Sequence, residues 1–180
     1  GDFPETVELI VDRNFSSFAD FIQERVGYYD LVWIGRTHNL ERLLPLLNES
    51  SRYLPVAGPV LDTEVIATPR TLERIRILGL PAPEISFDEL LQQELDCARF
   101  CQKVLTVTTH DAALARRAGC VNVSVLGHEL SPQPTPAPFE NRHNILFFGA
   151  IHDEGAPNHD SLVWFVESVL PLLDRVLPPA

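Results

Sequence analysis

The sequence of 180 residues contains no methionine, only three cysteines, and 14 basic residues against 25 acidic ones. An odd number of cysteines argues against a disulfide framework, and we therefore expect a reducing, cytoplasmic compartment. Cys97 and Cys101 lie one helical turn apart, with no histidine or third thiol spaced nearby, which suits a shared buried face better than a metal site. The net charge of −11 and the lack of a basic cluster argue against nucleic acid or an anionic membrane surface as a partner.

Long apolar runs and several well-known motifs are also missing. No apolar stretch approaches the length of a membrane span, and residues 1–5 lack the pattern of a signal peptide. The patterns G-x-S-x-G, H-E-x-x-H and C-x-x-C do not occur, which excludes serine-hydrolase, zincin and thioredoxin interpretations. Because no methionine stands at position 1 and the chain stops just after an expected helix, we expect it to be a piece of a longer protein.

Segments typical of strands and helices alternate about six times along the first 130 residues. This alternation predicts the α/β fold class, with βαβ units, a parallel sheet and helices on both faces of the sheet. The expected strands are residues 7–12, 29–35, 54–62, 103–108 and 121–127, and the expected helices are residues 16–26, 39–47, 69–78, 86–101 and 109–118.

Residues at the expected helix ends support these boundaries. Ser86 and Glu89 have the spacing of a capping box, and Thr108 precedes a helix in the same way. Thr68 is expected to be an N-cap residue followed by proline at the first helical position. Gly79 and Gly119 stand where a helix ends in the left-handed conformation.

A proline-rich stretch divides the sequence. Residues 131–138 contain four prolines in eight positions, which predicts a stiff extended linker. We therefore expect a first domain over residues 1–130, a linker over 131–141, and the start of a second α/β domain over 142–180.

The second domain is expected to open with a strand, a loop and a helix. Residues 145–148 predict a strand buried on both faces, and a helix follows from His159 with Asn158 as its N-cap. The loop from Gly149 to Asn158 could approach a phosphate, although it lacks the G-x-G-x-x-G and G-K-[ST] spacings and, from the pattern alone, we favour an ordinary βα turn. His152 and His159 lie seven residues apart and share no helix face, so we expect exposed or locally bonded side chains there and no metal.

Polar residues also follow the expected strands of the first domain. Asp62, Thr63 and Glu64 come directly after an apolar run, where carboxylates could act as a general base or bind sugar hydroxyls, or could cap the next helix. His38 and His110 follow two other strands, where they could line a cleft. The alternative for each histidine is a polar residue at a helix N-terminus, which we favour for His110.

In residues 60–70, 103–123 and 141–173, the sequence resembles GT-B glycosyltransferases of the family 4 (glycosyl transferases group 1) type. The phrases N-R-H-N-I-L-F-F-G at 141–149, A-P-N-H-D-S-L-V-W-F at 156–165 and V-L-P-L-L at 169–173 are similar to the start of their C-terminal domain. Residues 60–64 with Arg70 resemble their Y-D-T-E…R segment, with Leu61 in place of the tyrosine. Residues 103–108, followed by Asp111, Gly119 and 122–123, resemble the segment that closes their N-terminal domain.

This resemblance covers roughly residues 28–176 and implies two Rossmann-like domains facing a cleft, the GT-B architecture. It implies transfer of a sugar from a nucleotide-sugar donor to a glycan or lipid-linked acceptor, usually without a metal and with no other cofactor. In such an enzyme, the donor would be bound by Gly149, Ala150, His152 and Asn158. Thr63 and His38 would line the acceptor side of the cleft. Asp62 and Glu64 would be candidate catalytic residues.

The resemblance also implies that residues 1–130 are the later part of the N-terminal, acceptor-side domain, whose glycine-rich beginning would lie before Gly1. The E-x7-E segment and most of the donor-side domain would lie beyond Ala180. We therefore expect the chain by itself to be inactive. A second copy of the chain is a possible partner, because an incomplete sheet leaves an edge free to pair. The alternative is a non-catalytic α/β domain for assembly or regulation.

Overall fold

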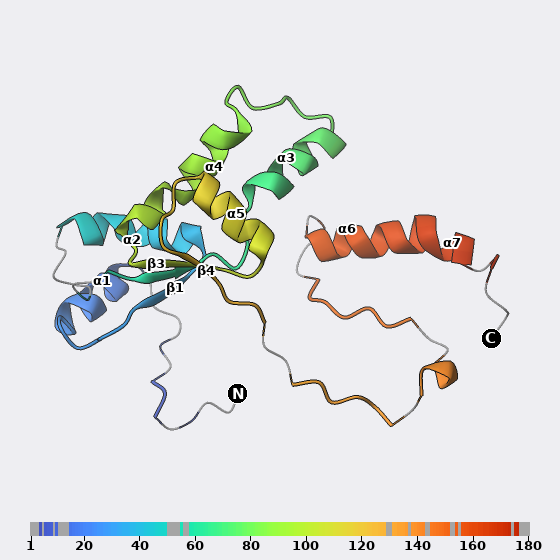
Figure 1. Cartoon of the computed structure of the whole chain (residues 1–180), viewed down its shortest axis with the longest axis horizontal. Helices are drawn as coiled ribbons and strands as arrows, with labels where there is room; N and C mark the ends of the chain where they lie inside the picture. The colour runs from blue at the N-terminus through green and yellow to red at the C-terminus, as the bar shows by residue number, and fades with distance from the viewer. Residues whose placement is uncertain are drawn as a thin grey trace. The chain divides into compact units, whose positions relative to one another are not determined.

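The structure, a computed structural model, divides the chain into two compact units, Gly1–Glu129 and Leu130–Ala180 (Figure 1). It describes residues 4, 6–8, 10, 15–49, 55, 58–128, 131–136, 138–142, 145–151, 154, 156–173 and 175–176. No helix among these residues is long and apolar enough to cross a membrane.

A four-stranded parallel sheet forms the centre of the first unit. Its strands are β1 (Trp33–Gly35), β2 (Val60–Asp62), β3 (Lys103–Thr106) and β4 (Val123–Val125), and they are ordered β1-β2-β3-β4. The predicted α/β class and parallel sheet are therefore confirmed, and the sheet is compatible with a Rossmann-like fold.

The connections between these strands lie on one face of the sheet. The connecting helices are α2 (Thr37–Glu49), α3 (Thr68–Ile77), α4 (Phe87–Leu95) with the 3₁₀ turn η2 (Asp96–Phe100), and α5 (Thr109–Arg117). Right-handed crossovers that always step in the same direction along a sheet place their helices on the same face, as Figure 1 shows. The prediction placed helices on both faces of the sheet. The strand-connecting helices all lie on one face, and helix α1 (Phe15–Glu24), which precedes β1, lies on the other side of the sheet in Figure 1.

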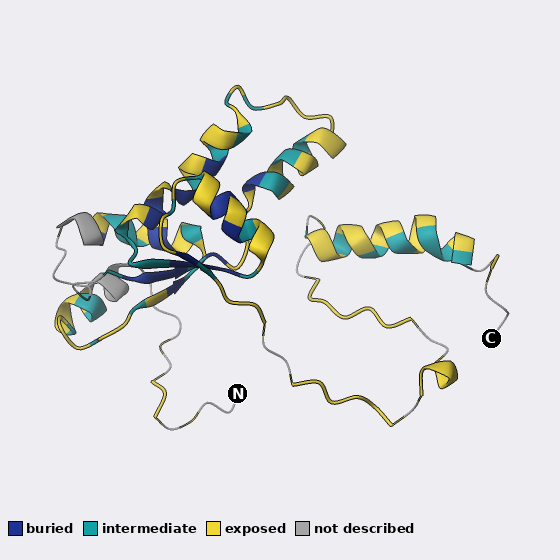
Figure 2. Ribbon diagram, in the orientation of Figure 1, coloured by how far each residue is buried: buried dark blue, intermediate teal, exposed yellow. Residues whose placement is uncertain are grey.

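The main core lies between this face and the connecting helices. Ile34, Leu61, Val104 and Val123 form one row across the four strands, because the register pairs each with the next. Leu40 of α2, Leu91 of α4 and Ala115 of α5 are fully buried against the same cluster (Figure 2). On the opposite face Val60 and Leu105 are also buried, whereas Trp33 of the edge strand is 49% exposed.

The strands are shorter than the sequence predicted. The expected strand over 29–35 is reduced to Trp33–Gly35, and the one over 54–62 to Val60–Asp62. A β-strand needs a hydrogen-bonded neighbour, and Pro55 and Pro59 have no N–H to donate to one. Of the expected strand over 7–12, residues 7, 8 and 10 are not in a strand, and the others lie outside the described residues.

Several predicted helix ends are confirmed. The Ser86–Glu89 capping box is complete, because the Glu89 N–H donates to Ser86 Oγ at 3.3 Å and the Ser86 N–H donates to Glu89 Oε2 at 2.8 Å. Thr108 accepts the Asp111 N–H at 3.0 Å and so caps α5. Gly79 and Gly119 have φ angles of 63° and 97°, as a left-handed helix end requires. The predicted helix over 86–101 changes to a 3₁₀ turn after Leu95.

Thr68, in contrast, does not cap α3. The N-cap residue is Ala67, and Glu94 of α4 takes over the capping role from across the unit. Its carboxylate accepts the N–H groups of Ala67 and Thr68 at 2.6 and 2.8 Å, and the Thr68 hydroxyl at 2.7 Å. A carboxylate at a helix N-terminus also suits the helix dipole, so this contact joins α3 to α4.

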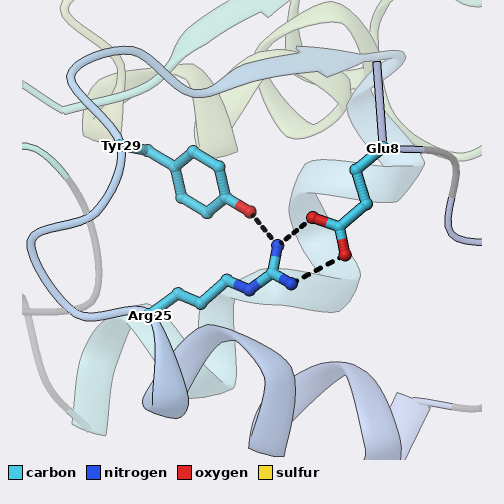
Figure 3. Close-up of polar contacts among 3 residues, drawn as sticks. All are labelled: Glu8, Arg25 and Tyr29. Atoms are coloured by element: carbon cyan, nitrogen blue, oxygen red, sulfur yellow. Dashed lines mark hydrogen bonds and ion pairs between the residues drawn. The ribbon is translucent and has the colours of Figure 1, made fainter. Parts of the chain in front are cut away.

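An ion pair joins the start of the first unit to the end of helix α1 (Phe15–Glu24). Figure 3 shows the Arg25 guanidinium between the Glu8 carboxylate, at 2.7 and 2.8 Å, and the Tyr29 hydroxyl, at 2.7 Å. The same guanidinium lies 4.1 Å from the centroid of the Phe21 ring, within the range of a cation–π contact. The hydrogen bond from Arg25 holds the pKa of Glu8 below its usual value.

The second unit has a different organisation from the one the sequence predicted. Residues 145–148 form no strand, and their side chains are 42–97% exposed, so the predicted buried strand is wrong. No described residue of this unit belongs to a strand, which leaves 145–148 without a neighbour to pair with. None of the described residues of this unit is buried (Figure 2).

The predicted helix of the second unit is present. It runs from Pro157 to Leu173 as α6 (Pro157–Trp164), a π-helical turn (Phe165–Val169) and α7 (Leu170–Leu173). The wider π turn shifts the helix register. The half-buried positions include Leu162, Phe165, Val169 and Leu173, while Val166 and Leu172 are exposed. The proline-rich residues 131–136 and 138 have no regular secondary structure, and a 3₁₀ turn follows at Phe139–Asn141.

We predict that Glu94→Ala lowers the free energy of unfolding by about 1–3 kcal/mol, because the Ala67 and Thr68 N–H groups and the Thr68 hydroxyl lose their acceptor. Urea unfolding followed by circular dichroism measures the effect. Gln93→Ala, at the exposed neighbouring position, is the matched control. An equal loss of unfolding free energy in Glu94→Ala and Gln93→Ala would show that the Glu94 cap contributes nothing to stability.

We also predict that Glu8 stabilises the fold in a pH-dependent way. Its pKa in the folded state lies below the ordinary value of 4.5, so its contribution is fully present above pH 4.5 and is lost as the pH falls through the folded value. Glu8→Gln should therefore lower Tm at pH 7, and the difference from the parent should shrink on acidification below 4.5. Glu24→Gln serves as the control. A Tm difference between Glu8→Gln and the parent that stays constant with pH contradicts the prediction.

Candidate functional site

The carboxyl edge of β1 and β2 brings together polar residues from two segments of the chain. The two strands are parallel and Gly35 pairs with Asp62, so the residues that follow each strand emerge at the same edge. Arg36 follows Gly35, and Thr63 and Glu64 follow Asp62. In open α/β sheets this edge is where ligands bind, because loops and helix N-termini converge on it.

Asp62 organises the turn after β2. Its backbone carbonyl accepts the Arg36 N–H at 2.7 Å, and its Oδ1 accepts the Glu64 N–H at 3.1 Å. The first contact extends the pairing of β1 and β2 by one residue, and the second fixes the path of the chain toward Glu64. The Asp62 carboxylate is half-buried and stays in contact with solvent.

Arg36 and Glu64 form an ion pair across the two strand ends. Arg36 Nε donates to Glu64 Oε2 at 2.8 Å, and the two side chains are 54% and 47% exposed. Gly35 permits the close approach, since a Cβ atom at that position would lie 2.9 Å from Glu64 Oε1. An exposed pair of this kind contributes at most about 1 kcal/mol to stability.

Arg36 and Glu64 also share an uncommon backbone conformation. Their φ angles are 69° and 52°, and they are the only non-glycine residues with positive φ in the described part of the chain. The left-handed conformation costs roughly 1–2 kcal/mol for a residue with a side chain. Strain of this kind concentrates at functional sites, so its occurrence at two paired residues singles out this edge.

The structure places Thr63 in the fold's interior. Its side chain is 1% exposed, and its hydroxyl and its N–H both donate to the Leu105 carbonyl at 3.0 Å. These bonds attach the end of β2 to β3. The prediction that Thr63 lines the acceptor side of a cleft is therefore not supported, because the hydroxyl is buried and already bonded.

His38 and His110 both lie at this end of the sheet, each in the first turn of a helix. His38 is exposed in α2, beside Asn39, whose side chain donates to the Gly35 carbonyl at 2.7 Å. His110 is exposed in α5 just after the Thr108 cap, in agreement with its interpretation as a polar residue at a helix start.

The site is an open edge in the first unit. Two cavities of this unit have volumes of about 430 and 380 Å³, and neither is lined by His38, Asp62, Thr63 or Glu64. The larger lies at the opposite, amino end of β3 and β4. What the edge offers chemically is two solvent-accessible carboxylates and a guanidinium with fixed backbone positions. The carboxylates can accept a proton, and all three groups can hydrogen-bond to sugar hydroxyls.

Residues expected to bind a donor gather at the start of α6. Asn158 Nδ2 donates to the Ala150 carbonyl at 2.9 Å, and a Cβ atom on Gly149 would lie 3.0 Å from the same nitrogen. The prediction that Asn158 is the N-cap residue is wrong, because the helix begins at Pro157, two residues earlier than predicted, with Ala156 as the N-cap. His152 lies outside the described residues.

The first turn of α6 has no side-chain cap. Its unpaired N–H groups and the helix dipole favour an anion at this position. His159 Nδ1 lies 3.7 Å from Asp160 Oδ1 and, among the described residues, has no hydrogen-bond partner. No group of three or more histidine, cysteine or acidic side chains in the described part of the chain has the geometry to hold a metal ion.

Arg36 was not predicted as a site residue. The sequence does contain a signal for a site there, because Arg36 is a charged residue directly after an apolar strand that ends in glycine. The contact with Glu64, 28 residues later in the chain, could not be foreseen without the strand order, because only neighbouring strands bring their ends together.

We predict that Glu64→Gly is more stable than Glu64→Ala by about 1 kcal/mol, because glycine adopts a positive φ without steric cost. Both substitutions remove the ion pair, so their difference reports the backbone strain of the alanine variant less the greater entropy of glycine in the unfolded chain. The free energies of unfolding in urea measure it. Equal stability of the two variants, or a more stable alanine variant, would contradict the prediction.

No family model, curated protein or solved structure matches this chain in the three corresponding comparisons. The function is therefore argued from the residues at the carboxyl edge of the sheet, from the loop before α6 and from the resemblance described above.

Proposed function

We propose that this chain is part of a GT-B glycosyltransferase that transfers a sugar from a nucleotide-sugar to a glycan or lipid-linked acceptor. The observation that carries the proposal is the carboxyl edge of β1 and β2. There the carboxylates of Asp62 and Glu64 contact solvent. Arg36 holds the Glu64 side chain in an ion pair, and both residues have a strained, left-handed backbone conformation. The sequence phrases before and within α6 add support through their resemblance to the same enzymes.

In this proposal the carboxyl edge faces the acceptor. Asp62 or Glu64 takes the proton of the acceptor hydroxyl. The oxygen of that hydroxyl forms a bond to the anomeric carbon of the donor sugar. The bond between that carbon and the diphosphate oxygen breaks, and the nucleoside diphosphate leaves. His38, exposed at the same edge, supplies a hydrogen-bonding group for other hydroxyls of the acceptor.

The loop before α6 faces the donor. The uncapped first turn of the helix offers N–H groups to the diphosphate, and the Asn158–Ala150 hydrogen bond joins the loop to that turn. Gly149 leaves room for this close contact, and His152 belongs to the same loop. The donor itself is the only small molecule required besides the acceptor, and the proposal includes no metal or other cofactor.

We further propose that residues beyond Ala180 complete the donor-side domain. They would supply partner strands for residues 145–148, whose apolar side chains are exposed in this chain. The chain by itself would then transfer no sugar. A cytoplasmic location and pairing with a second copy remain part of the same proposal.

We predict that Asp62→Asn, Glu64→Gln or the double substitution lowers kcat by about 10²–10⁴-fold in the full-length protein that contains this chain, as loss of a general base does. Release of nucleoside diphosphate from UDP- and GDP-sugars measures turnover. Glu84→Gln, at an exposed carboxylate in the connection between α3 and α4, is the control. Unchanged turnover in the double variant would refute the assignment of the base.

Calorimetric titration with the same nucleotide-sugars tests the donor side. Binding by the full-length protein and not by the 180-residue chain would support a donor site completed by further residues. No binding by either protein would refute the transferase proposal and favour the non-catalytic domain. Sugar transfer by the 180-residue chain alone would refute the division of the donor site.

A further inference from the structure

All three cysteines lie at the amino end of β3 and β4, away from the carboxyl edge. Cys97 is in η2 and buried in the core. Cys101 comes between η2 and β3, and Cys120 comes between α5 and β4. Both are half-buried against the core, and all three thiols are free.

Cys101 and Cys120 lead into neighbouring strands. Each lies three residues before the first residue of the β3–β4 pairing, which is Val104 in β3 and Val123 in β4. The two leading segments are joined, because the Val104 N–H donates to the Asn122 carbonyl at 2.9 Å and Asn122 Nδ2 donates to the Gln102 carbonyl at 2.5 Å. Neighbouring strands lie about 4.8 Å apart, and a disulfide spans Cα atoms about 4.4–6.8 Å apart. Where the pairing begins, the two segments therefore have a separation that a disulfide can span.

The same two cysteines line the larger cavity of the first unit. Its volume is about 430 Å³, and Lys103, Asn122 and Arg99 line it as well. A small reagent can therefore reach both thiols. Cys97 is not among the lining residues, because it is 2% exposed and faces the core.

We propose that Cys101 and Cys120 are a thiol pair that a small-molecule disulfide oxidises to an intramolecular disulfide between the amino ends of β3 and β4. The thiolate of one cysteine attacks the reagent, forms a mixed disulfide and releases one thiol. The thiolate of the other cysteine attacks the protein sulfur of the mixed disulfide and releases the second thiol. The two protein thiols lose two protons and two electrons, and the reagent is reduced to two thiols.

The buried environment sets the rate of this exchange. Burial raises the pKa of Cys101 to about 12 and also raises the pKa of Cys120. Because the thiolate is the attacking species, the exchange is slow at neutral pH and accelerates by about tenfold per pH unit below these pKa values. In a reducing compartment the bond therefore forms only under sustained oxidation and is reversed by a dithiol.

The test uses the 180-residue chain, oxidised glutathione at pH 7.5 and 8.5, alkylation of the remaining thiols, and trypsin. Cleavage after Arg99, Lys103 and Arg117 puts each cysteine in a separate peptide, 77–99, 100–103 or 118–142. We expect peptides 100–103 and 118–142 to be joined, with Cys97 alkylated. The bridged protein should form about tenfold faster at pH 8.5, and its Tm should rise by about 5–10 °C.

Variants separate this pair from other pairings. Cys97→Ser should still form the bridge, whereas Cys101→Ser and Cys120→Ser should stop at a mixed disulfide with glutathione and show no rise in Tm. Joining of peptide 77–99 to either other peptide as the main product would overturn the proposal. So would three alkylated thiols, glutathione adducts without a bridge in the parent chain, or a bridging rate that does not depend on pH.

Discussion

The parallel pairing of β2 with β1 on one side and β3 on the other is the interaction on which the first unit depends. It places Leu61 in the middle of the buried row that all four strands share, and it leaves Leu61 with no exposed surface. The helices can cover this row only because every connection returns on the same face. The Glu94 cap on α3 is a consequence, since it requires α3 and α4 to lie beside one another over that face.

The same pairing creates the candidate acceptor site. Two parallel neighbours end at one edge, so Arg36 and Glu64 meet although 28 residues separate them. Their ion pair is exposed and adds little stability, while their backbones are strained. A feature that costs stability without strengthening the core is best explained by a role in binding or catalysis, which is why the proposed function depends on this edge and not on the larger cavity.

Opposite ends of one sheet have different chemistry in this unit. At the carboxyl edge, charged side chains contact solvent, and at the amino end of β3 and β4 thiols line a cavity whose surroundings raise their pKa. The second unit has neither kind of site in its described residues beyond the first turn of α6 and the loop before it. Its exposed apolar residues, including Phe148 and Trp164, have no buried core to join.

Local signals in the sequence determined which segments are helices and where several of them end. The Ser86–Glu89 capping box, the Thr108 cap and the glycines at 79 and 119 are correct because each is decided by neighbours within a few residues. Only the tertiary structure decided the strand lengths, the placement of every connecting helix on one face, the cap supplied by Glu94 and the Arg36–Glu64 pair. Each depends on which strand or helix lies alongside. The predicted strand at residues 145–148 is wrong for the same reason, because an apolar run becomes a strand only where another strand accepts its hydrogen bonds.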